Sequence, residues 1–144
     1  MGETKPSSSD DRDLSTRDYR SLARFRHALR VFLRFSEDAA RERGLTPAQH
    51  QLMLAVRGWA GPERPAVNDL ADVLQLKPHS ALELARRAED AGLVRLEADP
   101  NDARRQLVGL APEGARHLAA LSSLHRAELR RFRTEMNEVL KELD

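Results

Sequence analysis

The chain has 144 residues, of which 40% are apolar and 33% charged, and its formal net charge is +1. This length fits one domain with its own core, and the composition favours a helix-rich protein with much charged surface. The absence of cysteine excludes disulfides, thiolate zinc sites and cysteine nucleophiles. No basic segment followed by an apolar run opens the chain, and no stretch is long enough to span a bilayer, so we expect a cytoplasmic protein without membrane contact.

The first helices are indicated by apolar spacing and by helix-stopping residues. Residues 1–15 are rich in serine and charge and offer little to bury, so we expect a disordered N-terminal tail. Apolar residues then recur every three or four positions over residues 16–43, which predicts a long amphipathic helix that stops at Gly44. The capping-box sequence Thr46-Pro47-Ala48-Gln49 begins a second helix, expected to reach Trp59 and to turn that side chain inward.

Two short helices come next and form a helix-turn-helix. The first is expected over residues 67–74, and Pro78 opens the second after a turn of about three residues. Small and apolar side chains of the second helix fall on one side and polar side chains on the other. The polar side is the candidate reader of the DNA major groove, and it carries His79, Ser80, Glu83, Arg86 and Arg87.

A β-hairpin follows the two helices. The apolar runs 93–97 and 106–110 flank the charged stretch from Asp99 to Gln106, which predicts a ribbon whose tip carries Arg104 and Arg105. A guanidinium fork matches phosphate oxygens and suits the minor groove, although arginines at a turn are often only solvated. The order of elements is therefore mainly α with a small β-ribbon, as in a winged helix-turn-helix.

The last part of the chain is again predicted to be helical. A helix restarts at Pro112 and keeps its apolar period to the C-terminus, with a break expected near Thr134. His117 and His125 are eight positions apart, too far along one helix to share an ion, so we expect no metal site and no cofactor. No nucleophile–base pair, phosphate-binding glycine loop or pair of catalytic carboxylates is found, which argues against an enzyme.

Charge counts against DNA binding by the segment from Ala66 to Leu110, which holds six basic and eight acidic residues, a net of −2. A DNA-binding lobe of that charge must gather its cations on one face. Glu83 can pair with a helix arginine, repel phosphate, or accept a hydrogen bond from a cytosine amino group, and these alternatives stay open.

Several short motifs occur together in one order. They are Leu45-Thr46-Pro47-Ala48-Gln49, Asp69-Leu70-Ala71, Glu89-Asp90-Ala91-Gly92-Leu93-Val94, Asp99-Pro100-Asn101-Asp102-Ala103-Arg104 and Leu110-Ala111-Pro112-Glu113-Gly114. In this order and spacing the chain resembles the MarR-type transcriptional regulators, the multiple antibiotic resistance regulator family, from about Leu22 to Leu143. It departs from the family pattern at Ala88, Leu96 and Ala111.

The resemblance implies a single domain over residues 16–144 that forms a homodimer. Segments 16–45 and 112–144 would make the dimerisation region, and 46–111 the winged helix-turn-helix lobe. Two lobes would bind a near-palindromic operator in double-stranded DNA and repress a nearby operon until a small, aromatic or phenolic ligand binds. By the same resemblance, Arg104 enters the minor groove and Asp102 holds the wing or its arginine in place.

An effector can change the spacing of the two recognition helices only from where the terminal helices meet the lobe. We therefore expect an effector pocket there, bordered by His27, His50 and Trp59. The competing hypothesis, suggested by the net charge of −2, is a winged-helix dimer that binds a protein partner or sequesters a small molecule without sequence-specific DNA binding.

Overall fold

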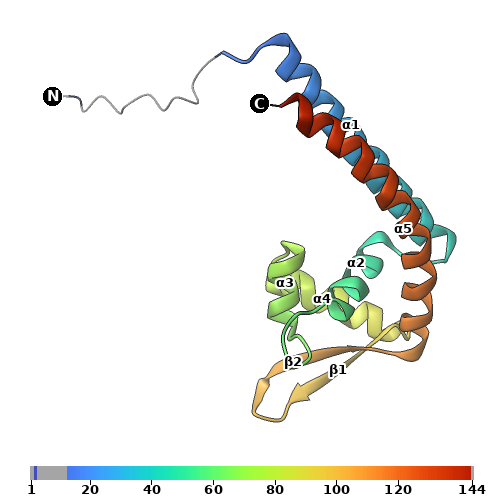
Figure 1. Cartoon of the computed structure of the whole chain (residues 1–144). Coiled ribbons are helices and arrows are strands. Elements are labelled where there is room, and N and C mark those ends of the chain that lie inside the picture. Colours follow the sequence, from blue (N-terminus) through green and yellow to red (C-terminus); the bar gives the residue numbers. More distant parts are fainter. Residues whose placement is uncertain (1, 3–12, 144) are drawn as a thin grey trace. The chain divides into compact units, whose positions relative to one another are not determined.

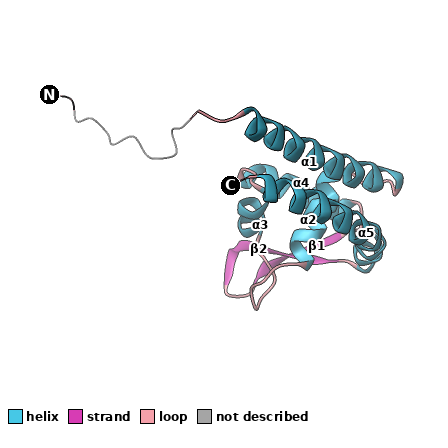
Figure 2. Cartoon of the chain, turned by 45° about the horizontal axis from the view of Figure 1, so that its top comes forward, coloured by secondary structure: helices cyan, strands magenta, loops and turns pink. Residues whose placement is uncertain are grey.

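The computed structural model describes residues 2 and 13–143, so most of the tail expected over residues 1–15 lies outside the described residues. Contacts divide the chain into two compact units. One, here called the helical hairpin, holds the described residues up to Leu33 and those from Glu128 on; the other, the lobe, holds Arg34–Ala127. The elements (Figures 1 and 2) are α1 (Thr16–Glu42), α2 (Pro47–Arg57), α3 (Val67–Leu74), α4 (Pro78–Asp90), β1 (Val94–Asp99), β2 (Asp102–Leu110) and α5 (Pro112–Glu142).

The helical hairpin pairs the first part of α1 with the last part of α5. The rings of Phe32 and Phe132 lie 5.2 Å apart, and the guanidinium of Arg24 donates to Glu142 at 2.9 Å and to Glu138 at 3.2 Å. Apolar side chains remain exposed along both helices, which leaves surface that one copy does not bury. They include Tyr19, Leu22, Phe25, Val31, Leu33, Leu129 and Leu140.

Helix α5 is continuous over its 31 residues, so the break expected near Thr134 is wrong. The hydroxyl of Thr134 donates to the Arg130 carbonyl at 3.2 Å, one turn back. This bond satisfies the hydroxyl within the helix, so a threonine at this position does not interrupt it. No helix among the described residues is both long and apolar enough to cross a membrane.

Helix α2 starts as predicted and ends earlier than predicted. Thr46 accepts from the Gln49 amide at 3.1 Å, and the Gln49 side chain accepts from the Thr46 amide at 3.0 Å, which completes the capping box. The helix ends at Arg57 with Gly58 as its cap. Trp59 therefore lies beyond the helix and is half-buried rather than turned into the core.

The helix-turn-helix is formed by α3 and α4, as predicted. Gln75 takes the left-handed conformation with φ 57°, and the Leu76 amide donates to the Ala71 carbonyl at 2.8 Å, which closes the turn. Helix α4 packs through Ala81, Ala85 and Ala88, all at most 1% exposed. Because these side chains are small, α4 lies close to its neighbours and its polar face stays outside.

The ribbon is longer than the sequence predicted. Register runs from Val94 opposite Leu110 to Asp99 opposite Asp102, with an irregularity between Ala98 and Asp99. Only Pro100 and Asn101 connect the strands, so the stretch taken as a charged tip belongs mostly to β2. The Asp99 carboxylate accepts from the Asn101 amide at 2.9 Å and closes this turn.

The base of the ribbon is joined to its neighbours through the backbone. The Val108 amide donates to the Pro65 carbonyl at 2.9 Å, and Ala66 pairs with Leu107. After Gly92, with φ +77°, the Leu93 amide donates to Ala88 at 2.9 Å.

At the start of α5, the Leu93 carbonyl accepts from the Ala111 amide at 3.0 Å. Gly114 packs directly on this carbonyl: a Cβ added at Gly114 would lie 2.1 Å from the oxygen. The close approach of α5 to the ribbon therefore needs a residue without a side chain at position 114.

Gly114→Ala is expected to destabilise the lobe by about 1–3 kcal/mol, because backbone must move to admit the methyl group. Urea unfolding followed by circular dichroism measures this change. The exposed-site control Ala119→Gly reports helix propensity alone, which favours alanine by about 1 kcal/mol. A Gly114→Ala variant as stable as the parent, or more stable, would show that α5 does not approach Leu93 this closely.

Candidate nucleic-acid interface

The polar face of α4 is exposed along its length. His79, Ser80, Glu83, Arg86 and Arg87 all face solvent. Arg87 Nη2 lies 2.7 Å from Glu83 Oε1, so the acid on this face is paired with a neighbour one turn away. In the described part of the chain Arg86 has no carboxylate within 4.0 Å, which leaves its guanidinium available to a partner.

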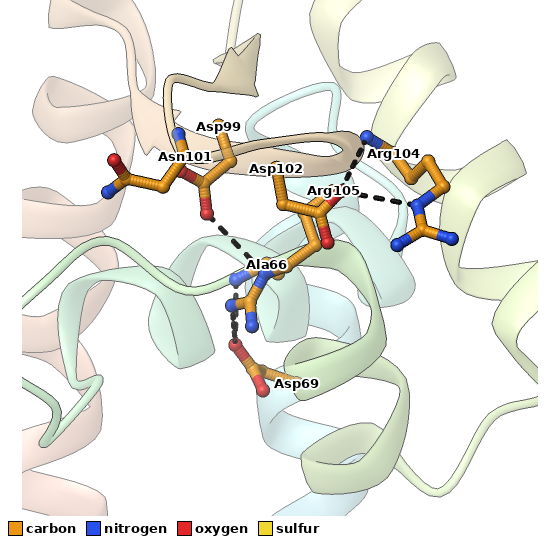
Figure 3. Close-up of polar contacts among 7 residues, drawn as sticks. All are labelled: Ala66, Asp69, Asp99, Asn101, Asp102, Arg104 and Arg105. Atoms are coloured by element: carbon orange, nitrogen blue, oxygen red, sulfur yellow. Dashed lines mark hydrogen bonds and ion pairs between the residues drawn. The ribbon is translucent and has the colours of Figure 1, made fainter.

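The wing presents Arg104 to solvent. Asp102 Oδ1 accepts from the Arg104 backbone amide at 3.1 Å and lies 3.4 Å from its Nε. The Arg104 side chain is nevertheless 93% exposed, and Figure 3 shows it extending away from the other labelled side chains. Asp102 thus fixes the start of the side chain and leaves the outer nitrogens of the fork free to bind an anion.

Arg105 points the other way, because neighbouring residues of a strand face opposite sides. Its Nη2 lies 3.4 Å from Asp69 Oδ2 and its Nε 3.6 Å from Asp99 Oδ2 (Figure 3). Asp69 also accepts from the Ala66 amide at 2.9 Å, at the start of α3. Arg105 therefore links the ribbon turn to the first helix of the helix-turn-helix, with two carboxylates around its charge.

A cleft of about 290 Å³ separates the starts of α3 and α4 from β2. His79 from α4 and both wing arginines contribute to its lining, although the guanidinium of Arg104 extends into solvent and that of Arg105 lies against Asp69 and Asp99. Asn68 and Gln106 line the same cleft and were missed from sequence. The signal for Gln106 was its two-residue spacing from Arg104, which places both on one strand face once position 104 is recognised as strand.

Most acids of the lobe are engaged within it. Six of the eight between Ala66 and Leu110 bind a backbone amide or an arginine. The Glu89 carboxylate, for example, accepts from the Leu96 amide at 2.6 Å. Most of the carboxylates behind the net charge of −2 thus make hydrogen bonds within the fold. They are Asp69, Glu83, Glu89, Glu97, Asp99 and Asp102.

The three residues expected around an effector lie in different surroundings. His27 is exposed in the helical hairpin and lines a groove of about 470 Å³ beside Phe32 and Phe132. His50 is 3% exposed within the lobe. Trp59 borders a separate lobe pocket of about 450 Å³.

His50 belongs to a buried polar cluster. Its ring lies 4.9 Å from that of His125, whose Nε2 is 2.8 Å from Ser36 Oγ and whose Nδ1 is 2.7 Å from the Leu121 carbonyl. Since a carbonyl only accepts, His125 Nδ1 carries the hydrogen. His50 Nδ1 is buried without a hydrogen-bond partner, and burial followed by repulsion from His125 lowers the pKa of His50.

The two histidines of α5, His117 and His125, make separate contacts. His117 accepts from Arg43 Nε at 3.2 Å and lies 3.5 Å from Glu113, in a network separate from that of His125. Within residues 13–143, no three His, Asp or Glu side chains gather closely enough to hold a metal ion.

The lowered pKa of His50 makes stability depend on pH. Below the ordinary value of 6.5 the unfolded chain takes up a proton at this histidine that the folded chain resists. The free energy of unfolding is therefore expected to fall as pH drops from 7.5 to 5.5, and to fall less in His50→Phe. Urea unfolding at several pH values measures both slopes, and equal slopes would contradict the assignment.

Arg105→Gln is expected to loosen the ribbon turn. Because the arginine is half-exposed, its loss should cost under about 1 kcal/mol of global stability. Hydrogen exchange of amides 99–103 should nevertheless quicken several-fold while α4 is unchanged, with Arg104→Gln as the neighbouring control. Equal exchange in both variants would mean that the two ion pairs do not position the turn.

Together, a helix-turn-helix and a two-stranded ribbon in one lobe, with paired long helices in a second unit, define a winged helix-turn-helix protein. Solved structures share this fold. AbsC, a MarR family transcriptional regulator from Streptomyces coelicolor, matches with a TM-score of 0.74 at 24% identity over 92% of this chain and 90% of that one. A MepR–DNA complex from S. aureus matches at 0.69 and 20% identity, covering 90% and 93%. CouR from Rhodococcus jostii RHA1, bound to p-coumaroyl-CoA, matches at 0.69 and 21% identity, covering 90% and 93%.

Sequence comparison points the same way. The MarR family profile matches residues 43–105. The transcriptional regulator HosA of Escherichia coli O111:H- is 41% identical over 76 residues, which are 53% of this chain and 54% of HosA, so the match spans about half of that relative. Over residues 43–105 the chain is therefore similar to MarR family proteins, and over about half its length it is similar to a transcriptional regulator.

Proposed function

We propose that this chain is a dimeric regulator of transcription that binds double-stranded DNA and represses a nearby operon. The observation that carries the proposal is the single lobe surface on which the α4 polar face and the cleft beside it meet the 93%-exposed side chain of Arg104. The MepR–DNA complex, of similar fold, supports DNA as the partner.

In this proposal α4 lies in the major groove and the ribbon beside it. Arg104 enters the minor groove, held by Asp102, while Arg86 contacts phosphate or a guanine edge. His79 and Ser80, at the start of α4, approach the sugar–phosphate backbone of the DNA, because the N-terminus of a helix attracts phosphate. Arg105 acts by holding the turn that carries Arg104, and the Glu83–Arg87 pair borders the contact.

Arg104→Ala is expected to weaken binding to the cognate site about tenfold or more, because a good groove contact contributes about 1–3 kcal/mol. The site is first selected from random DNA fragments, and affinity is then measured by gel-shift titration. Arg126→Ala, an exposed arginine on α5, is the matched control. Unchanged affinity in Arg104→Ala would remove this residue from the interface.

The dimer would form through the exposed apolar side chains of the helical hairpin and carry two lobes. Their recognition helices would then meet successive major grooves about 34 Å apart on a near-palindromic operator. This arrangement makes the two half-sites of the operator a reflection of the two-fold symmetry of the protein.

The double variant Phe25→Glu/Leu129→Glu is expected to shift a dimer to a monomer, because it would bury two carboxylates in the joint. Sedimentation equilibrium at micromolar concentration measures the mass. Arg26→Ala, exposed on the same helix, should remain dimeric. A parent chain that sediments as a monomer would contradict the proposal itself.

The effector we propose is a small molecule of the aromatic or phenolic kind, whose binding releases the DNA. CouR, bound to p-coumaroyl-CoA, supports a ligand of this character. His27 in the helical hairpin, and His50 and Trp59 in the lobe, are each a candidate contact for it, at separate places. Gel shifts repeated with aromatic acids test the release: they should free the DNA at concentrations where their neutral amides do not.

A further inference from the structure

The side chain of Glu83 lies at the middle of the exposed face of α4. The helix packs on the rest of the lobe through Ala81, Ala85 and Ala88, all at most 1% exposed. Successive residues of an α-helix turn by about 100°, so a residue two positions from a buried one lies on nearly the opposite side. Glu83 is two positions from both Ala81 and Ala85, and it therefore points away from the core. Any partner that receives this face of α4 must accommodate a carboxylate.

One arginine holds this carboxylate, and a second arginine lies beside it. Arg87 Nη2 donates to Glu83 Oε1 at 2.7 Å across one helical turn. The Glu83 side chain is still 53% exposed, and a carboxylate can accept about four hydrogen bonds, so the pair leaves it able to accept more. Arg86, three positions after Glu83, has no carboxylate within 4.0 Å among the residues that the structure describes. Helix α4 thus presents an acceptor fixed by one guanidinium beside the donors of another.

The pairing lowers the cost of bringing an acid to DNA. An isolated carboxylate would be repelled by the phosphates on both sides of a groove, whereas Glu83 and Arg87 together carry no net charge. The ion pair also restricts the orientation of the Glu83 side chain. Less conformational freedom is therefore lost when its carboxylate forms a further hydrogen bond.

The major groove offers few groups to which a carboxylate can bind. A carboxylate only accepts hydrogen bonds, and guanine and thymine present only acceptors on their major-groove edges. Adenine presents its N6 amino group, but the N7 acceptor beside it repels a carboxylate oxygen. Cytosine presents its N4 amino group without a neighbouring acceptor. A carboxylate at the middle of a helix face that enters this groove therefore selects cytosine.

We propose that Glu83 determines base specificity by accepting a hydrogen bond from the N4 amino group of a cytosine, with Arg87 as the positioning residue that holds its carboxylate. This inference rests on the proposed function, in which α4 lies in the major groove, and gives the pair a role within the contact that it borders. Arg86 lies about 4.5 Å farther along the helix axis, near the step of about 3.4 Å between base pairs. The cytosine therefore lies beside the base pair that Arg86 reaches.

The test begins with the site that the full chain selects from random DNA fragments. Each cytosine of a half-site is then replaced in turn by thymine, another pyrimidine, which presents the O4 acceptor in place of the N4 donor. Gel-shift titration should reveal one position at which this replacement weakens binding by the parent about tenfold or more. At that position Glu83→Ala should bind the two sites within about twofold of each other, because the discriminating acceptor is gone.

Three further variants separate base reading from charge and from folding. Glu83→Gln should prefer adenine at the same position, since the glutamine amide accepts from N6 and donates to N7, and a loss of folding cannot produce this change of preference. Arg87→Ala should discriminate in the same direction as the parent but less strongly. Asp90→Ala is the matched control: it removes an exposed acid from the last turn of α4 and should change the affinity for all sites equally.

The outcomes distinguish this inference from the proposal that the chain binds DNA. A parent chain that enriches no DNA fragment would overturn the proposed function and this inference with it. If a site is enriched but both Glu83 variants discriminate among the bases at every position as the parent does, DNA binding stands and the role of Glu83 is excluded.

Discussion

The backbone of Leu93 is the constraint on which the lobe depends. Its amide donates to Ala88 at the end of α4, and its carbonyl accepts from Ala111 before α5. Gly92 supplies the positive φ that aims the chain into this position, and Gly114 lets α5 approach the same carbonyl. Helix α4, the ribbon and α5 therefore meet at the backbone of one residue, and the surface formed by α4 and the wing has a fixed shape.

Hydrogen bonds within the lobe also determine what its acidic residues do. Counted along the sequence, they argued for a surface that repels DNA and so for a protein or small-molecule partner. In the structure Asp69, Asp99 and Glu89 complete caps, turns and strand ends, where a carboxylate satisfies amides that would otherwise lack a partner. Net charge bears on solubility and long-range attraction. The charge that a ligand meets at one surface depends instead on which charged side chains are already paired within the protein.

Sequence was a good guide where structure is local. The capping box before α2, the bounds of α3 and the proline start of α4 follow from residues within one helical turn of one another. The length of the ribbon was misjudged because the Asp99 turn and the irregularity beside it shorten the connection to two residues. Once position 104 lies in a strand, Arg104 and Arg105 must face opposite ways, a distinction that a reading as turn could not make. The burial of His50 depends on packing between helices distant in the sequence, and no local pattern marks it.

The two-stranded ribbon also has a consequence for solubility. A sheet of two strands has unpaired backbone groups along both edges, and such edges can template pairing with another chain. Near its base β2 is covered by the pairing of Ala66 with Leu107. Farther out Arg104 and Arg105 bring charge to the strand, and Pro100 in the turn has no amide to offer. The charges on β2 thus oppose the joining of two ribbons into a longer sheet.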